Sequence, residues 1–123
     1  MKKLILASVF LFISPIFAAE LSFESISGKY EITHPAVPSI TTVEIQTDGQ
    51  VLLVEKSEMG EYVCIGEAVI EGKNLTSNVE CQDSATFKQV IDFSGVENYD
   101  KFTAPVYSSL FDMSLPMNFV KIQ

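Results

Sequence analysis

Residues 62–81 read YVCIGEAVIEGKNLTSNVEC and contain both cysteines of the 123-residue chain. Gly72 and Lys73 lie near the centre of this stretch, and if they form a two-residue turn, Cys64 faces Cys81 across a hairpin. In this register the two cysteines form a non-hydrogen-bonded pair, with Cα atoms about 4.5 Å apart. Disulfides tolerate Cα–Cα distances of about 4.4 to 6.8 Å. The sequence therefore predicts a disulfide in an antiparallel hairpin that has one apolar face.

The chain begins with a segment typical of an export signal. Two lysines precede an apolar run, Pro15 interrupts that run, and small residues follow. We expect cleavage after Ala18, so that residues 1–18 are a signal peptide and residues 19–123 form a single domain. The protein is then secreted or periplasmic, and these oxidising locations favour a disulfide. The apolar run is too short for a membrane span, and we expect none elsewhere.

The charge balance is strongly acidic. The chain has 16 Asp and Glu residues against 8 Lys and Arg, and all eight of the latter are lysines. Nucleic acids and anionic membrane surfaces are bound by clustered Lys and Arg, so we expect neither as a partner. An acidic protein can instead be steered electrostatically toward a cationic protein partner.

Alternating apolar and polar residues recur along the chain and are separated by short turns. The Asp-Gly pair at 48–49 is typical of a type I′ turn, which would place Ile45 opposite Leu52 and turn Val51 and Leu53 outward. No stretch up to Phe93 has a helical period, and residues 94–100 form either a helical turn or a long connection. About eight such strands predict an all-β fold, namely a small antiparallel meander β-barrel with one disulfide. A β-sandwich is the alternative.

The first expected strand opens with Gly28-Lys29-Tyr30. This tripeptide is similar to the Gly-x-Trp pattern in the first strand of lipocalins, with Tyr30 in the place of tryptophan. The resemblance implies a lipocalin-like, or calycin-like, barrel that binds a small apolar ligand. As an acidic, exported β domain with one disulfide, the chain also looks like the small periplasmic inhibitors of lysozyme. That likeness implies an inhibitor of a cationic hydrolase.

Residues that could support catalysis or metal binding are sparse. His34 is the only histidine, and no Ser or Cys nucleophile motif accompanies it. Glu55, Glu58 and Glu61 cluster around an expected turn, where carboxylates are solvated rather than held as a catalytic pair. One histidine with two paired cysteines cannot build a tetrahedral metal site. We therefore expect no enzyme activity, no catalytic residue, no cofactor and no metal.

Aromatic and flexible apolar side chains concentrate near the end of the chain. Beside a small barrel, such side chains commonly form a cavity mouth or a contact surface. The predicted ligand- or partner-binding residues are Tyr99, Phe102, Tyr107, Ser108, Phe111, Met113 and Met117. The predicted lining of an internal cavity is Ile45, Leu52, Phe87 and Phe93.

These patterns together predict a secreted or periplasmic, non-catalytic binding protein. Its barrel would bind a small apolar ligand or a protein partner. One alternative is an acidic inhibitor of a cationic hydrolase such as lysozyme. A second alternative is a structural subunit of an envelope assembly, for which an outward-facing Val51 and Leu53 would provide the contact surface.

Overall fold

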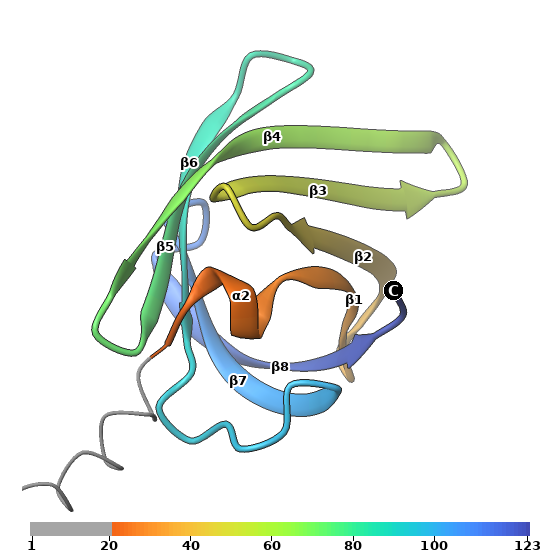
Figure 1. The fold of residues 1–123 in the computed structure, drawn as a ribbon. Coiled ribbons are helices and arrows are strands. Elements are labelled where there is room, and N and C mark those ends of the chain that lie inside the picture. The colour runs from red at the N-terminus through yellow and green to blue at the C-terminus, as the bar shows by residue number, and fades with distance from the viewer. Residues whose placement is uncertain (1–20) are drawn as a thin grey trace, which may run out of the picture.

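The structure is a computed structural model, and it describes residues 21–123. One short helix, α2 (Phe23–Ile26), precedes eight strands. The strands are β1 (Gly28–His34), β2 (Val37–Ile45), β3 (Gln50–Ser57), β4 (Gly60–Glu71), β5 (Asn74–Cys81), β6 (Thr86–Asp92), β7 (Lys101–Ser108) and β8 (Met113–Lys121). Each strand pairs antiparallel with the next, and β8 pairs with β1 (Figure 1), so the sheet closes on itself. The predicted eight-stranded meander barrel is confirmed, in preference to the sandwich.

The predicted signal peptide lies outside the described residues. Among residues 21–123, no helix is long and apolar enough to cross a membrane.

The β4–β5 hairpin has the predicted register. Glu71 pairs with Asn74 around the turn, and Cys64 pairs with Cys81 at the far end. The turn is possible because Gly72 adopts a φ of 66°, which glycine reaches without steric cost. The two cysteines form the predicted disulfide, with Cα atoms 3.8 Å apart, closer than ideal strand geometry gives. This disulfide is consistent with an oxidising, exported compartment.

The β2–β3 hairpin differs from its prediction by one residue. The Gln46 amide donates to the Gln50 carbonyl at 2.9 Å, so the turn contains three residues rather than two. Ile45 therefore pairs with Val51. A shift of one residue moves every side chain of the strand to the other face. Val51 and Leu53 are consequently buried inside the barrel, and the prediction that they face outward was wrong.

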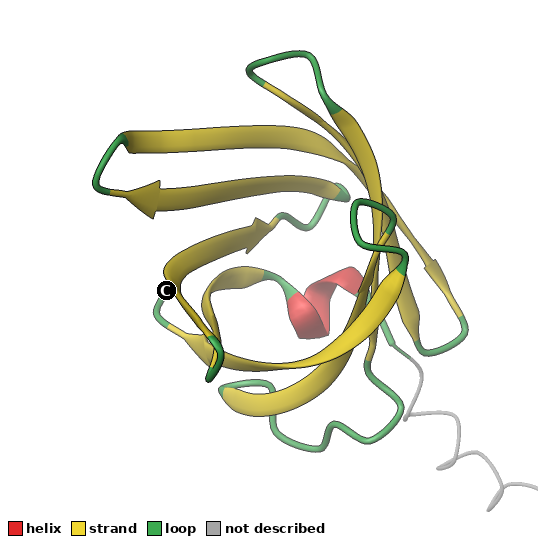
Figure 2. Ribbon diagram, turned by 180° about the vertical axis from the view of Figure 1, so that it is seen from behind, coloured by secondary structure: helices red, strands yellow, loops and turns green. Residues whose placement is uncertain are grey.

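Helix α2 was not predicted, because its four residues are too few to produce a helical period. A local signal was present, since Ser22 and Ser25 form a reciprocal capping box at its start. The helix lies within the ring of strands when the barrel is viewed from opposite sides (Figure 1 and Figure 2). Ile26 is fully buried, and the Tyr30 hydroxyl donates to the Ile26 carbonyl at 2.7 Å. The helix thereby fills one end of the barrel, which we call the closed end.

Aromatic rings complete the packing of the closed end. Phe102 stacks on Phe119 with ring centroids 4.6 Å apart, and Tyr30 meets Phe102 edge to face at 5.8 Å. Phe93 packs against Phe102 and Tyr99. Because side chains occupy this end, any internal cavity must lie toward the other end of the barrel.

The buried Tyr30 hydroxyl predicts a specific response to alkaline pH. Burial, with smaller contributions from Asp100 and Tyr99, raises the pKa of Tyr30 to about 12. The folded state therefore retains this proton above pH 10, where the unfolded chain loses it, so the free energy of unfolding should fall between about pH 10 and 12. Tyr30→Phe should abolish the corresponding late step in phenolate absorbance. The same variant should lower the free energy of unfolding at neutral pH by about 1 kcal/mol, because the Ile26 carbonyl loses its hydrogen bond. A Tyr30 that titrates with exposed tyrosines would contradict this packing.

Candidate binding pocket

A cavity of about 400 Å³ opens at the end of the barrel opposite α2. We call this the open end. It carries the β1–β2 turn, the β3–β4 turn, the 82–85 turn and the β7–β8 loop at 109–112. The lining residues are Ile32, Thr33, His34, Ser39, Thr41, Leu53, Glu55, Tyr62, Cys64, Phe87, Gln89, Val106, Ser108, Leu110, Phe111, Met113, Leu115 and Met117. Most of them are apolar, so the interior of this end can desolvate an apolar molecule.

Four of the seven residues predicted for the site line this pocket: Ser108, Phe111, Met113 and Met117. The other three lie elsewhere. Tyr99 and Phe102 belong to the aromatic packing of the closed end. Tyr107 points away from the interior, because it alternates with the inward-facing Val106 and Ser108 along β7.

The predicted cavity lining was mostly wrong. Only Phe87 among its four residues borders the pocket. Ile45 and Phe93 are fully buried in the filled core, and each is 2% exposed. Leu52 points outward, because β3 is shifted by one residue relative to the prediction. Strand periodicity identified inward faces, but it did not distinguish the filled end of the barrel from the open one.

The β7–β8 loop forms part of the mouth and exposes apolar side chains. Leu110 is 56% exposed and Phe111 is 67% exposed, although both also border the pocket. The loop is anchored at its base, where the Tyr107 hydroxyl donates to Asp112 Oδ1 at 2.9 Å. That hydrogen bond raises the pKa of Tyr107. Two large apolar side chains thus stand at the entrance on a loop with a fixed base.

Gln89 is the most unusual polar residue in the pocket wall. It lies on β6 between the inward-facing Phe87 and Ile91. Its Oε1 atom is buried and has no hydrogen-bond partner among residues 21–123. Gln89 was not predicted as a site residue, although a glutamine at an inward position of an alternating strand was a visible signal. Buried polar atoms are normally hydrogen-bonded, so an unpaired one beside a cavity calls for an explanation.

The charges around the mouth are predominantly negative. Glu55 borders the pocket and accepts a hydrogen bond from the Ser39 hydroxyl at 3.1 Å. The Tyr62 hydroxyl donates to Asp83 Oδ1 at 2.7 Å, which lowers the pKa of Asp83 and raises that of Tyr62. No lysine is found among the described lining residues, and the chain has no arginine. The electrostatic setting of this pocket therefore disfavours anions.

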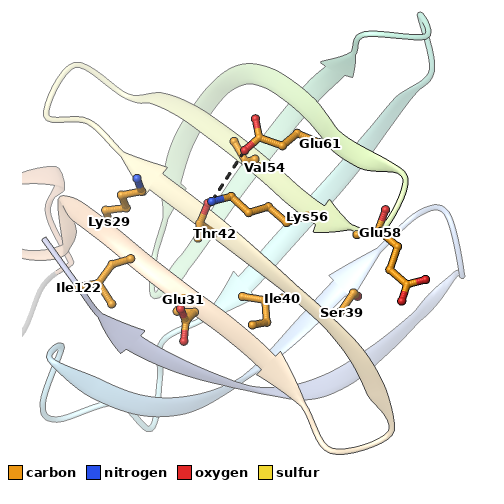
Figure 3. A pocket seen from close by; sticks show the side chains of 11 residues that line it. Lys29, Glu31, Ser39, Ile40, Thr42, Val54, Lys56, Glu58, Glu61 and Ile122 are labelled. Atoms are coloured by element: carbon orange, nitrogen blue, oxygen red, sulfur yellow. Dashed lines mark ion pairs between the residues drawn. The ribbon is translucent and has the colours of Figure 1, made fainter.

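A second hollow, of about 740 Å³, lies on the outer surface of the barrel (Figure 3). It runs over β1, β2 and β3 and is bordered by lysines and glutamates in nearly equal numbers. Lys56 Nζ lies 3.8 Å from Glu61 Oε2, and both side chains are more than half exposed. An exposed ion pair of this kind contributes little to stability. This outer groove has mixed charge and lies on the outer face of the sheet, so it offers neither the mostly apolar lining of the barrel pocket nor a uniformly acidic face.

The fold and pocket define a closed eight-stranded barrel with one filled end and one open, mostly apolar end. Comparisons with protein-family models, with curated proteins and with solved structures found no match to this chain. The geometry of the pocket itself is therefore what indicates a function.

Proposed function

We propose that this chain is an exported, non-catalytic binding protein whose barrel holds a small apolar ligand at its open end. The cavity of about 400 Å³ is the observation that carries this proposal. Small-molecule sites are typically concave, mainly apolar and about 300 to 1,000 Å³ in volume, with a few polar groups that orient the ligand. The barrel pocket has each of these properties.

The distribution of packing supports the same proposal. The closed end is filled by α2 and by buried rings such as Phe93 and Phe119, each at most 2% exposed. At the open end, the apolar side chains Leu115 and Met117 remain partly exposed even though they face inward. A ligand that covers them would gain the free energy of burying apolar surface, about 25 cal/mol per Å².

The non-catalytic part of the proposal rests on the surroundings of the single histidine. His34 lies at the end of β1, and its Nδ1 atom accepts a hydrogen bond from the Ala36 amide at 3.0 Å. A catalytic histidine is usually oriented by a carboxylate and serves a nucleophile. Here the ring is instead engaged in the local β1–β2 turn.

The ligand proposal predicts that filling the pocket will weaken ligand binding. Leu115 and Val120 are both on β8, but Leu115 faces the pocket whereas Val120 is on the outer face. In a titration with the neutral fluorophore N-phenylnaphthylamine, Leu115→Trp should weaken binding by about tenfold or more, a loss of about 1.4 kcal/mol or more. The reason is that the indole occupies the volume that the fluorophore needs.

Val120→Trp is the matched control, since it adds the same side chain outside the barrel, and it should leave the affinity unchanged. Circular dichroism and an intact-mass measurement of the disulfide would verify that both variants fold. Equal binding by the wild-type protein and both variants would place the fluorophore outside the pocket and would contradict the proposal, as would an absence of binding to the wild-type protein.

A protein partner at the mouth is the second candidate, and the exposed side chains of the turns favour it. Met59 is 97% exposed and Phe111 is 67% exposed, on the β3–β4 turn and the β7–β8 loop. Carboxylates of Glu58, Asp83 and Asp112 accompany them, which suits a cationic partner such as a cationic hydrolase. The Leu115→Trp variant separates the two candidates, because a partner bound to the turns would still bind. The structural-subunit alternative loses its contact surface, since Val51 and Leu53 are buried.

A further inference from the structure

The Gln89 side-chain carbonyl is an unpaired hydrogen-bond acceptor in the wall of the proposed pocket. Gln89 lies opposite Ser77 on β5 and opposite Ser108 on β7. These three residues form a short polar row across the inner wall of the barrel. The Ser108 hydroxyl oxygen already accepts a hydrogen bond from the Leu110 amide at 3.2 Å. Gln89 Oε1 has no such partner among the residues that the structure describes.

An amide carbonyl oxygen accepts hydrogen bonds and cannot donate them. Gln89 Oε1 is already shielded from solvent in the ligand-free barrel, and a purely hydrocarbon ligand would leave it without a partner. A ligand with a hydroxyl or N–H group at this depth would instead complete the hydrogen bonding of the wall. Gln89 thus favours ligands that carry a donor over ligands of the same shape that do not.

The charges of the lining argue against an anionic head group. A buried carboxylate needs a cation or several donors to compensate for lost hydration. The described lining contains neither lysine nor arginine, and Glu55 at its rim would repel an anion. His34 is the one basic side chain in the lining, and its Nδ1 atom is occupied by the Ala36 amide. A fatty acid is therefore a poor fit, whereas an uncharged head group meets no such penalty.

We infer that the pocket selects an uncharged, mainly apolar molecule with one hydrogen-bond donor, which Gln89 Oε1 accepts. This inference rests on the proposed function, because it assigns the polarity of a ligand in the same cavity. A long-chain alcohol is the simplest representative of this chemical class.

Three probes with the same alkyl chain test the inference: decanol, its methyl ether and decanoate. Each would compete with N-phenylnaphthylamine for the wild-type protein. Decanol should bind roughly five- to tenfold more tightly than the ether, which can accept but not donate a hydrogen bond. Decanoate should bind most weakly. In Gln89→Met, a replacement of similar length without the carbonyl, the advantage of decanol over the ether should disappear, while the ether should bind at least as well as to the wild-type protein.

The outcomes separate this inference from the proposed function. Equal affinity of the wild-type protein for decanol and the ether would overturn the donor assignment and leave apolar binding in the barrel intact. Tightest binding of decanoate would overturn the inference that the head group is uncharged. Failure of all three probes to displace the fluorophore would overturn the inference, whereas the proposed function would still be judged by the effect of Leu115→Trp on fluorophore binding. The comparison of probes on the wild-type protein does not depend on whether the Gln89→Met variant folds.

Discussion

Replacing both cysteines by alanine is expected to lower the free energy of unfolding by about 3 kcal/mol. The Cys64–Cys81 disulfide joins residues 17 apart in sequence and so closes a loop in the unfolded chain. Without the disulfide, the unfolded chain gains conformational entropy, and unfolding becomes more favourable. Both cysteines are buried, at 4% exposure each, and Cys64 borders the pocket. Urea denaturation followed by circular dichroism would measure the change.

The double variant is preferable to a single one, because a lone cysteine would leave a free thiol. The wild-type protein treated with a reductant is the matched control, and its unfolding midpoint should shift in the same direction. Since Cys64 is part of the pocket wall, affinity for N-phenylnaphthylamine should also fall in the double variant. An unchanged midpoint after complete reduction would mean that the disulfide does not stabilise the barrel.

Gly66→Ala is expected to destabilise the fold by about 3 kcal/mol or more, at the upper end of the range for overpacking. Gly66 lies on β4 directly opposite Val79 of β5. A Cβ atom at this position would overlap the carbonyl oxygen of Asn78 and would lie 2.7 Å from the Val79 Cα atom. These are backbone atoms, so rotation of a side chain cannot relieve the overlap. The two strands would have to separate beside the disulfide.

Gly95→Ala provides the matched control for this substitution. Gly95 lies in the β6–β7 loop, and an added Cβ atom there meets no described atom within 4 Å. The free energy of unfolding of the Gly95→Ala protein should stay within about 0.5 kcal/mol of the wild-type value. Thermal and urea unfolding of both variants would make the comparison. A Gly66→Ala protein as stable as the Gly95→Ala protein would show that β4 and β5 can separate at little cost.

The sequence alone was sufficient to predict the features that depend on residues close together along the chain. The β4–β5 hairpin was predicted correctly because a two-residue turn and a pair of cysteines each define the same register, with Cys64 opposite Cys81. The barrel was predictable because short turns between alternating strands leave few topologies, and closure removes unpaired edges. The β2–β3 register was not predictable in the same way. Its Asp-Gly pair fits turns of two or three residues, and no second marker chose between them.

Only the tertiary structure decided which inward-facing residues fill the barrel and which line a pocket. Strand alternation assigns a side chain to the inner face, but it does not give the height of that side chain along the barrel axis. Phe93 and Phe87 have the same periodicity, yet Tyr99 and Phe102 pack against Phe93 in the filled core, whereas Phe87 borders the pocket. Such contacts arise when the sheet closes, because closure brings together residues that no local pattern in the chain relates.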